Sequence, residues 1–93
     1  MTYKLKFEKR AWREWEKLGH PVKEQFKKKL AERLENPRVP SAKLSGHADR
    51  YKIKLRSAGY RLVYQVFDDE VVVSVIAIGK RENSDVYNIA SNR

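Results

Sequence analysis

Three apolar segments joined by short turns constrain the fold of this chain more than any other feature. In the first segment apolar and cationic residues alternate strictly, which is the period of a β-strand with one buried face. The segments are 51–55, 60–67 and 71–78, and the turns between them are Ser57-Ala58-Gly59 and Asp68-Asp69. Because turns this short join neighbouring strands of opposite direction, we predict an antiparallel three-stranded meander.

The apolar positions of the first two strands select one register, since a slip by one residue would turn every apolar side chain to solvent. This register pairs Leu55 with Tyr60, Ile53 with Leu62 and Tyr51 with Tyr64. It also places Lys54 opposite Arg61, and Lys52 opposite Val63, on the outer face of the sheet. Like charges directly opposed across a sheet are destabilising. We therefore interpret Lys54 and Arg61 as a pair that holds an anion.

Two helices are predicted before this meander. Their apolar residues recur at helical spacing, as Ala11, Trp12, Trp15 and Leu18 in the first and as Val22, Phe26, Leu30 and Leu34 in the second. Gly19 supplies a C-terminal stop for the first helix, and Pro21 can open the second. Asn36 ends the second helix, because a residue that precedes proline is pushed out of helical geometry.

An N-terminal strand completes the prediction. Residues 2–7 alternate, with Tyr3, Leu5 and Phe7 on the buried face. The order is therefore β-α-α-β-β-β with a short C-terminal tail or helix. Two helices grouped on one side of an antiparallel sheet make an α+β fold, and we expect one domain over residues 1–93.

The chain carries a formal net charge of +9, and the surplus lies in one half. Residues 1–56 hold 17 Lys and Arg against 7 Asp and Glu, whereas residues 57–93 hold 4 against 5. A basic surface of this strength favours a polyanionic partner such as nucleic acid. A run such as Lys27-Lys28-Lys29 is also typical of a solvated helix face, so charge alone leaves both interpretations open.

Composition excludes several function classes. Without cysteine the chain has no disulfide, no thiolate zinc site and no cysteine nucleophile. His20 and His47 lack the spacing of metal ligands, so we expect no metal and no cofactor. Because no apolar segment is long enough for a signal peptide or a membrane span, we expect a soluble cytoplasmic protein with no membrane partner.

The remaining candidates for chemistry are cationic, with one tyrosine. They are Lys52, Lys54, Arg61, Arg81 and Tyr87. Such a set suits a phosphodiester, because phosphoryl transfer needs positioning and charge stabilisation more than covalent help from the protein. A plain basic binding face, with Tyr87 packing the tail onto the sheet, is the alternative that spacing alone leaves open.

Several stretches of the sequence resemble the RelE family, the toxins of bacterial RelBE toxin–antitoxin pairs. They are Trp15-Glu16-Lys17-Leu18, Lys43-Leu44-Ser45-Gly46, the whole run from Tyr51 to Tyr64, Ile78-Gly79-Lys80-Arg81-Glu82 and Val86-Tyr87. The resemblance covers nearly the whole chain, and the run from Tyr51 to Tyr64 is its most specific part. It implies a RelE/ParE-like fold of the microbial ribonuclease type.

The resemblance also implies an activity, that of a ribosome-dependent endoribonuclease (mRNA interferase) that inhibits translation under stress. Such toxins cut the mRNA codon in the ribosomal A site by attack of a 2′-hydroxyl on the adjacent phosphate, which leaves a 2′,3′-cyclic phosphate. Tyr87 is implied as the base, and Arg81 as the acid or charge partner of the leaving oxygen. Arg61 would hold the scissile phosphate, while Lys52 and Lys54 would stabilise the transition state.

The implied partners are the 70S ribosome, with its mRNA and rRNA, and a RelB-like antitoxin through which operator DNA is contacted in transcriptional autoregulation. For RNA binding we assign the cations Lys23, Lys27, Lys28, Arg33, Arg56 and Lys80. Two alternatives stay open: a ParE-like toxin that acts by binding gyrase, and a non-catalytic RNA-binding module. The set that includes Arg81 and Tyr87 argues against both, since neither function needs a proton-handling tyrosine.

Overall fold

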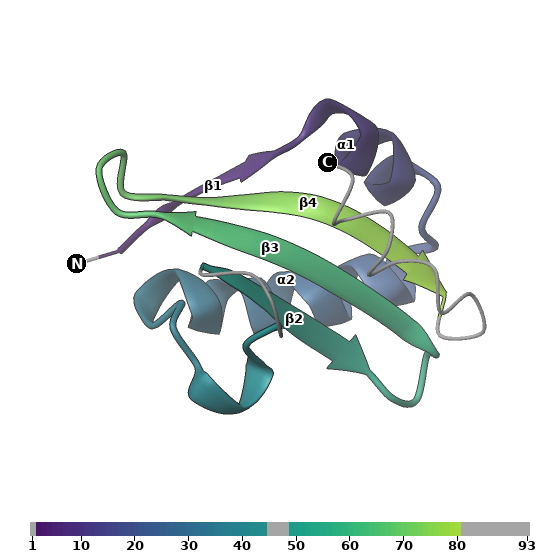
Figure 1. Cartoon of the computed structure of the whole chain (residues 1–93). Helices are drawn as coiled ribbons and strands as arrows, with labels where there is room; N and C mark the ends of the chain where they lie inside the picture. Colours follow the sequence, from purple (N-terminus) through teal and green to yellow (C-terminus); the bar gives the residue numbers. More distant parts are fainter. Residues whose placement is uncertain (1, 45–48, 81–93) are drawn as a thin grey trace.

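The computed structural model describes residues 2–44 and 49–80, and within them two helices lie against a four-stranded sheet (Figure 1). The elements in chain order are β1 (Lys4–Phe7), α1 (Lys9–Glu16), α2 (His20–Glu35), the 3-10 helix η1 (Pro40–Ala42), β2 (Arg50–Leu55), β3 (Tyr60–Phe67) and β4 (Val72–Lys80). This order confirms the predicted α+β fold class. The predicted C-terminal tail or helix lies outside the described residues.

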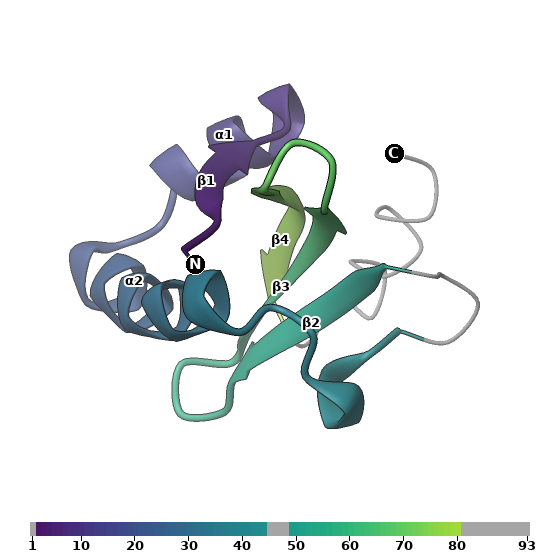
Figure 2. The same cartoon turned by 90° about the vertical axis from the view of Figure 1, so that its left-hand side faces the viewer.

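The strand order in the sheet is β1-β4-β3-β2, so β1 and β2 form its two edges. β2, β3 and β4 form the predicted antiparallel meander, whereas β1 runs parallel to β4. The sheet is therefore mixed, and the prediction of a purely antiparallel sheet was wrong. The physical reason is that both helices separate β1 from the meander, and so long a connection allows a parallel pairing. Figure 2 shows α2 along one side of the sheet.

The predicted register of β2 and β3 is confirmed. Leu55 pairs with Tyr60, Ile53 with Leu62 and Tyr51 with Tyr64. These residues join one hydrophobic core with the inner faces of both helices, including Trp15, Phe26 and Leu30. The core accordingly lies between the helices and one face of the sheet. The opposite face is left to carry the cationic residues of β2 and β3.

A β-bulge in β4 sets the pairing beside the cationic residues. Val63 pairs with Ala77 and Tyr64 with Val75, so Ile76 is the extra residue. Because of this residue, Ile76 and Ala77 both join Val63 in a second hydrophobic cluster, outside the main core, against which Leu44 packs. The bulge shifts the alternation of β4 so that Ile78 returns to the main core.

Four details of the sequence prediction were wrong. Leu5 is 38% exposed and Trp12 is 47% exposed, because β1 is an edge strand and α1 buries Ala11 and Trp15 instead. Gly19 does not stop α1 in a left-handed conformation: its φ is −68°, and it is the N-cap of α2. β4 begins at Val72 rather than at Val71, which takes a positive φ of 54° in the turn.

Candidate anion-binding site

Cationic side chains from β2 and β3 meet on the outer face of the sheet. Lys54 pairs directly with Arg61, and Lys52 pairs with Val63, as the sequence predicts. On its other side Arg61 pairs with Gly79 of β4. Lys54 is exposed and Arg61 is partly buried. This pairing places two like charges beside each other, which favours an anion between or above them.

A cavity of about 360 Å³ opens beside this pair, at the end of β2 and β3. Its lining consists of Lys54, Leu55, Arg56, Tyr60 and Arg61. Among the described residues, no carboxylate lines it. Three cations gathered in one cavity suit an anion, and guanidinium groups can bind a phosphate through two parallel hydrogen bonds.

A second cavity, of about 380 Å³, lies along the edge of β2, beside η1. Its lining consists of Arg33, Ser41, Ala42, Lys52, Lys54 and Arg56. The two cavities share Lys54 and Arg56, so they are neighbours on one cationic surface. The segment after η1 is held to β2 by a bridge between Lys43 and Tyr51, which keeps this groove in place.

Arg33 reaches this groove from the last turn of α2. Its Nη1 donates to the hydroxyl of Tyr64 at 2.9 Å and to the backbone carbonyl of Lys52 at 3.2 Å. The same hydroxyl donates to the carbonyl of Pro37 at 2.7 Å. Burial raises the pKa of Tyr64, while Arg33 opposes that rise, so the phenol is neutral and can donate at neutral pH.

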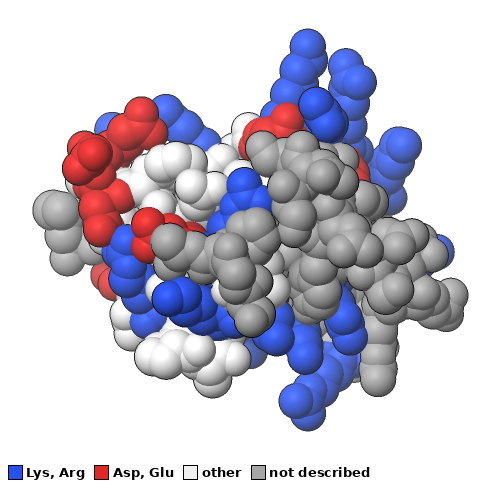
Figure 3. Space-filling model, viewed as in Figure 1, with Lys and Arg blue, Asp and Glu red and all other residues white. Residues whose placement is uncertain are grey.

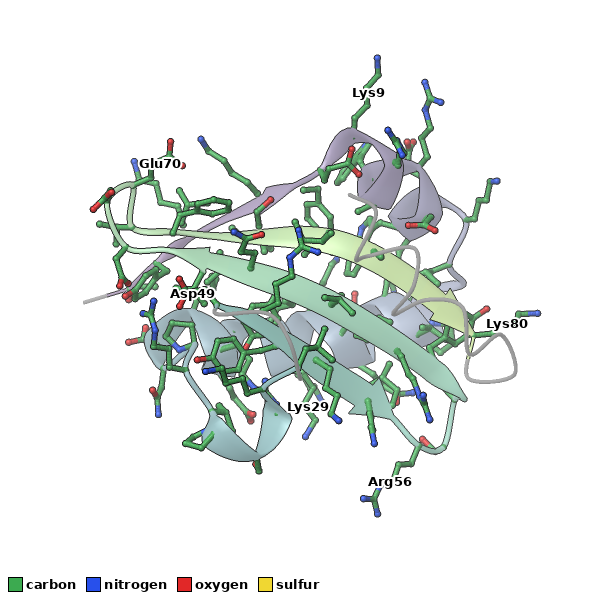
Figure 4. All side chains as sticks on the ribbon, viewed as in Figure 1. Lys9, Lys29, Asp49, Arg56, Glu70 and Lys80 are labelled. Carbon is green, nitrogen blue, oxygen red and sulfur yellow. The ribbon has the colours of Figure 1, made fainter. Side chains whose placement is uncertain are left out.

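The structure brings together only part of the predicted site. Lys52, Lys54, Arg56 and Arg61 share one surface, and Lys80 pairs with Tyr60 at the same end of the sheet. Figure 4 shows Arg56 and Lys80 at that end, with Glu70 at the other. Arg81, the residue bonded to Lys80, and Tyr87 lie outside the described residues.

The cations assigned to RNA binding on α2 divide into two groups. Lys23, Lys27 and Lys28 belong to a helix that packs on the core side of the sheet, away from the Lys54–Arg61 pair, and Lys27 forms an ion pair with Glu24 at 3.3 Å. Arg33 instead turns to β2. Sequence reasoning missed this separation, and it missed the places of Tyr60 and Ser41 in the two cavities. The sequence pattern does not single out either residue, because Tyr60 has the spacing of a core residue and Ser41 lies in a segment typical of a loop.

The far end of the sheet is acidic. Arg38 forms ion pairs with Asp49 at 3.0 Å and with Asp68 at 2.7 Å, and the hydroxyl of Tyr3 donates to Asp68 at 2.8 Å. The hydrogen bond from Arg38, followed by that from Tyr3, lowers the pKa of Asp68. Figure 3 shows acidic side chains gathered where β3 turns into β4, and cationic side chains spread over much of the same view. A polyanion is thus directed to the Lys54–Arg61 end.

Two further properties bear on function. Within residues 2–44 and 49–80, no cluster of three or more His, Cys, Asp and Glu side chains could hold a metal ion. In the same part of the chain, neither helix has the length and apolar character needed to cross a membrane.

Comparisons with known proteins show the family to which the chain belongs. Residues 5–84 match the family described as the ParE toxin of the type II toxin–antitoxin system parDE, which defines the class as a toxin of such systems. The mRNA interferase toxin RelE of Escherichia coli K12 is 61% identical over 93 residues, which cover all of this chain and 98% of the relative. The chain thus belongs to the RelE toxins of the RelBE family.

Solved structures support the same assignment. A substituted E. coli RelE in the free state has 60% sequence identity and a TM-score of 0.92, and the match covers 100% of this chain and 98% of that chain. The toxin in the crystal structure of the intact E. coli RelBE toxin–antitoxin complex has 63% identity and a TM-score of 0.81. That match covers 84% of this chain and 95% of the other.

Proposed function

We propose that this protein is an mRNA interferase toxin, a ribosome-dependent endoribonuclease that cuts mRNA codons in the ribosomal A site. The observation that carries the proposal is the Lys54–Arg61 pair, opposed across β2 and β3 beside a cationic cavity. Repulsion between such charges is offset when a phosphate binds them both. The relative named mRNA interferase RelE, identical at 61% of positions, supplies the substrate class.

In the proposed reaction the 2′-oxygen of the substrate attacks the adjacent phosphorus, the bond to the 5′-oxygen breaks, and a 2′,3′-cyclic phosphate is left. Arg61 holds the scissile phosphate, and Lys52 and Lys54 stabilise the charge that develops on its oxygens. Tyr87 takes the proton of the 2′-hydroxyl. Arg81 protonates the leaving 5′-oxygen or stabilises it by charge. Cationic neighbours favour the phenolate form that a tyrosine base requires.

The proposed partners follow from the same assignment. The toxin binds the 70S ribosome with its mRNA and rRNA, in the cytoplasm. A RelB-like antitoxin neutralises it, as the complex of the E. coli relatives suggests, and contacts operator DNA for both proteins in autoregulation. We expect the toxin-binding part of the antitoxin to be acidic, because this chain carries a net charge of +9.

A ParE-like toxin that acts by binding gyrase is the second candidate, and the name of the matched family favours it. An inhibitor that acts by binding alone has no use for an exposed lysine opposed to an arginine. The RelE relatives, which match over the whole chain, favour cleavage. A non-catalytic RNA-binding module would account for the charge alone.

Primer extension on programmed ribosomes with a vacant A site tests the proposal. We expect new mRNA ends within the A-site codon, and none when ribosomes are omitted. Arg61→Gln should abolish most of the cleavage, whereas Arg13→Gln, an equal loss of charge on the exposed surface of α1, should retain it. Intact mRNA together with inhibited gyrase would support the ParE-like alternative, and RNA binding without cleavage would support the binding module.

A further inference from the structure

We propose that the groove between η1 and β2 is a second phosphate subsite, in which Arg33 binds the backbone of the mRNA next to the cleaved linkage. The proposal rests on the proposed function, since it concerns the same RNA strand. Its ligand is a phosphodiester oxygen of the substrate. The residues that would contact this phosphate are Arg33 and Ser41.

The first argument is the way in which Arg33 is held. Both hydrogens of Nη1 are used, one by Tyr64 and one by the carbonyl of Lys52. In residues 2–44 and 49–80, no hydrogen bond engages the hydrogens of Nε and Nη2, so three donors of the guanidinium remain. The group is thus fixed by two bonds on one nitrogen while an edge suited to a phosphate stays available.

The second argument is the rigidity of the anchor. Tyr64 is fully buried on β3, and its hydroxyl is itself held by the carbonyl of Pro37. The guanidinium carbon of Arg33 lies 5.8 Å from the centre of the Tyr64 ring, within the range of a cation–π contact. An arginine held in this way loses little conformational entropy when it binds a ligand.

The third argument is continuity with the first cavity. Lys54 and Arg56 line both cavities, and Lys52 and Lys54 lie two residues apart on one face of β2, about 6.6 Å along the strand. No carboxylate of the described chain lines either cavity. An RNA strand whose scissile phosphate contacts Arg61 can therefore continue along the edge of β2 with its next phosphate in the groove.

The experiment pairs a protein variant with a single neutral phosphate in the substrate. Ribosomes are programmed with mRNA that carries a 2′-deoxy nucleotide at the cleavage position, so that the toxin binds without cutting. One phosphate on either side of the scissile linkage is replaced in turn by a methylphosphonate. Toxin affinity is measured for the wild type, for Arg33→Gln and for Arg13→Gln as the matched loss of charge.

We expect one flanking methylphosphonate to weaken wild-type binding about tenfold, as for the loss of a charge-assisted hydrogen bond. Arg33→Gln should weaken binding to unmodified mRNA by a similar factor and lose its sensitivity to that methylphosphonate. Arg13→Gln should keep the full wild-type sensitivity. Ser41→Ala should lower the affinity less than Arg33→Gln does and should keep part of the sensitivity to that methylphosphonate. Because Ser41 is exposed, this variant tests the groove even if Arg33→Gln fails to fold.

Three results would overturn the subsite. The first is Arg33→Gln with wild-type affinity. The second is Arg33→Gln with weaker affinity but unchanged sensitivity at every phosphate, which would assign Arg33 to ribosomal RNA or to folding. The third is a wild-type toxin that cleaves unmodified mRNA but whose affinity is unchanged by either flanking methylphosphonate. A wild-type toxin that does not cleave mRNA would instead refute the proposed function.

Discussion

Lys54 and Arg61 occupy directly opposed positions on β2 and β3, with both side chains on the face of the sheet away from the helices. Burial of the alternating apolar residues on the other face favours this opposition, because a slip by one residue would expose Ile53 and Leu62. The core thus fixes two like charges in directly opposed positions. In the proposed function, a phosphate bound by both side chains would offset the repulsion between them.

Neutralising one member of this pair should separate function from stability. Arg61→Gln should lower single-turnover cleavage of ribosome-bound mRNA by about 10²-fold, because the charge on the phosphate oxygens loses a preorganised partner. The free energy of unfolding in urea should change little, since Arg61 is only partly buried and lies outside the main core. Cleavage by Arg61→Gln at the wild-type rate would show that Arg61 does not stabilise the scissile phosphate.

The two proposed proton-handling residues follow the last described strand in the sequence. Tyr87→Phe should bind ribosomes normally but lower single-turnover cleavage by about 10²-fold or more, as expected for the loss of a general base. Arg81→Ala should cause a comparable loss, because the leaving oxygen loses its acid or charge partner. Rapid-quench measurements on saturated complexes test both variants. Cleavage by Tyr87→Phe at the wild-type rate would refute the role of Tyr87.

The meander could be predicted from the sequence because residues 51–55 alternate strictly, short turns follow, and a slip by one residue against residues 60–67 would expose the apolar side chains. The bulge at Ile76 could not be predicted from the sequence. Val75, Ile76, Ala77 and Ile78 are all apolar, so the pattern does not reveal where the alternation reverses. The reversal depends on pairing with β3, which is a tertiary property.

The candidate site was predictable to the extent that it follows strand parity. Lys52, Lys54 and Arg61 were placed on one face by alternation alone, and the structure confirms that face. The position of Arg33 depends instead on the packing of α2 against β2 and on its hydrogen bond to the hydroxyl of Tyr64 on β3. Helical periodicity places Arg33 beside the apolar stripe but does not say which strand it contacts.

The buried hydroxyl of Tyr64 should contribute measurably to stability. Tyr64→Phe leaves the carbonyl of Pro37 without its donor and Arg33 without one acceptor, and we expect a loss of about 1–3 kcal/mol in the free energy of unfolding. Tyr51→Phe is the matched control, because Tyr51 stacks on Tyr64 and its hydroxyl makes no hydrogen bond within the described residues. Equal effects of the two substitutions in urea denaturation would contradict this role.

Stability should fall in acid partly through Asp68. Arg38 and Tyr3 lower the pKa of this carboxyl in the folded state below its ordinary value of about 3.9. Its contribution is therefore present in full above the unfolded-state pKa and is lost as the pH falls through the folded-state pKa. In urea denaturation at a series of pH values, the stability difference between wild type and Asp68→Asn should shrink as the pH falls from about 5 to about 2.

The neighbouring variant Asp69→Asn is the control for this prediction. Asp69 lies in the same turn and makes no ion pair within the described part of the chain. Its substitution should change stability little at any of these pH values. A difference between wild type and Asp68→Asn that stays constant with pH would show that the interaction with Arg38 does not depend on the charge of Asp68.

Ribosome affinity should depend steeply on salt, and the lysines of α2 should carry part of that dependence. Lys23, Lys27 and Lys28 lie on the helix that packs on the core side of the sheet, so in the proposed complex they would contact ribosomal RNA while the opposite face binds mRNA. Each phosphate contact releases counterions when it forms. Lys28→Gln should therefore lower the slope of log affinity against log salt by about 1, measured by equilibrium binding from ~50 to ~200 mM salt.

Cleavage within the saturated complex should stay within about twofold of wild type in this variant, because Lys28 acts on binding rather than on the scissile phosphate. Lys4→Gln is the matched control, since Lys4 is equally exposed but lies on β1, where its backbone bonds to Val71 after the acidic turn. A polyanion should avoid that end, so the salt slope of Lys4→Gln should equal that of the wild type. Equal slopes for Lys28→Gln and wild type would show that α2 does not contact RNA.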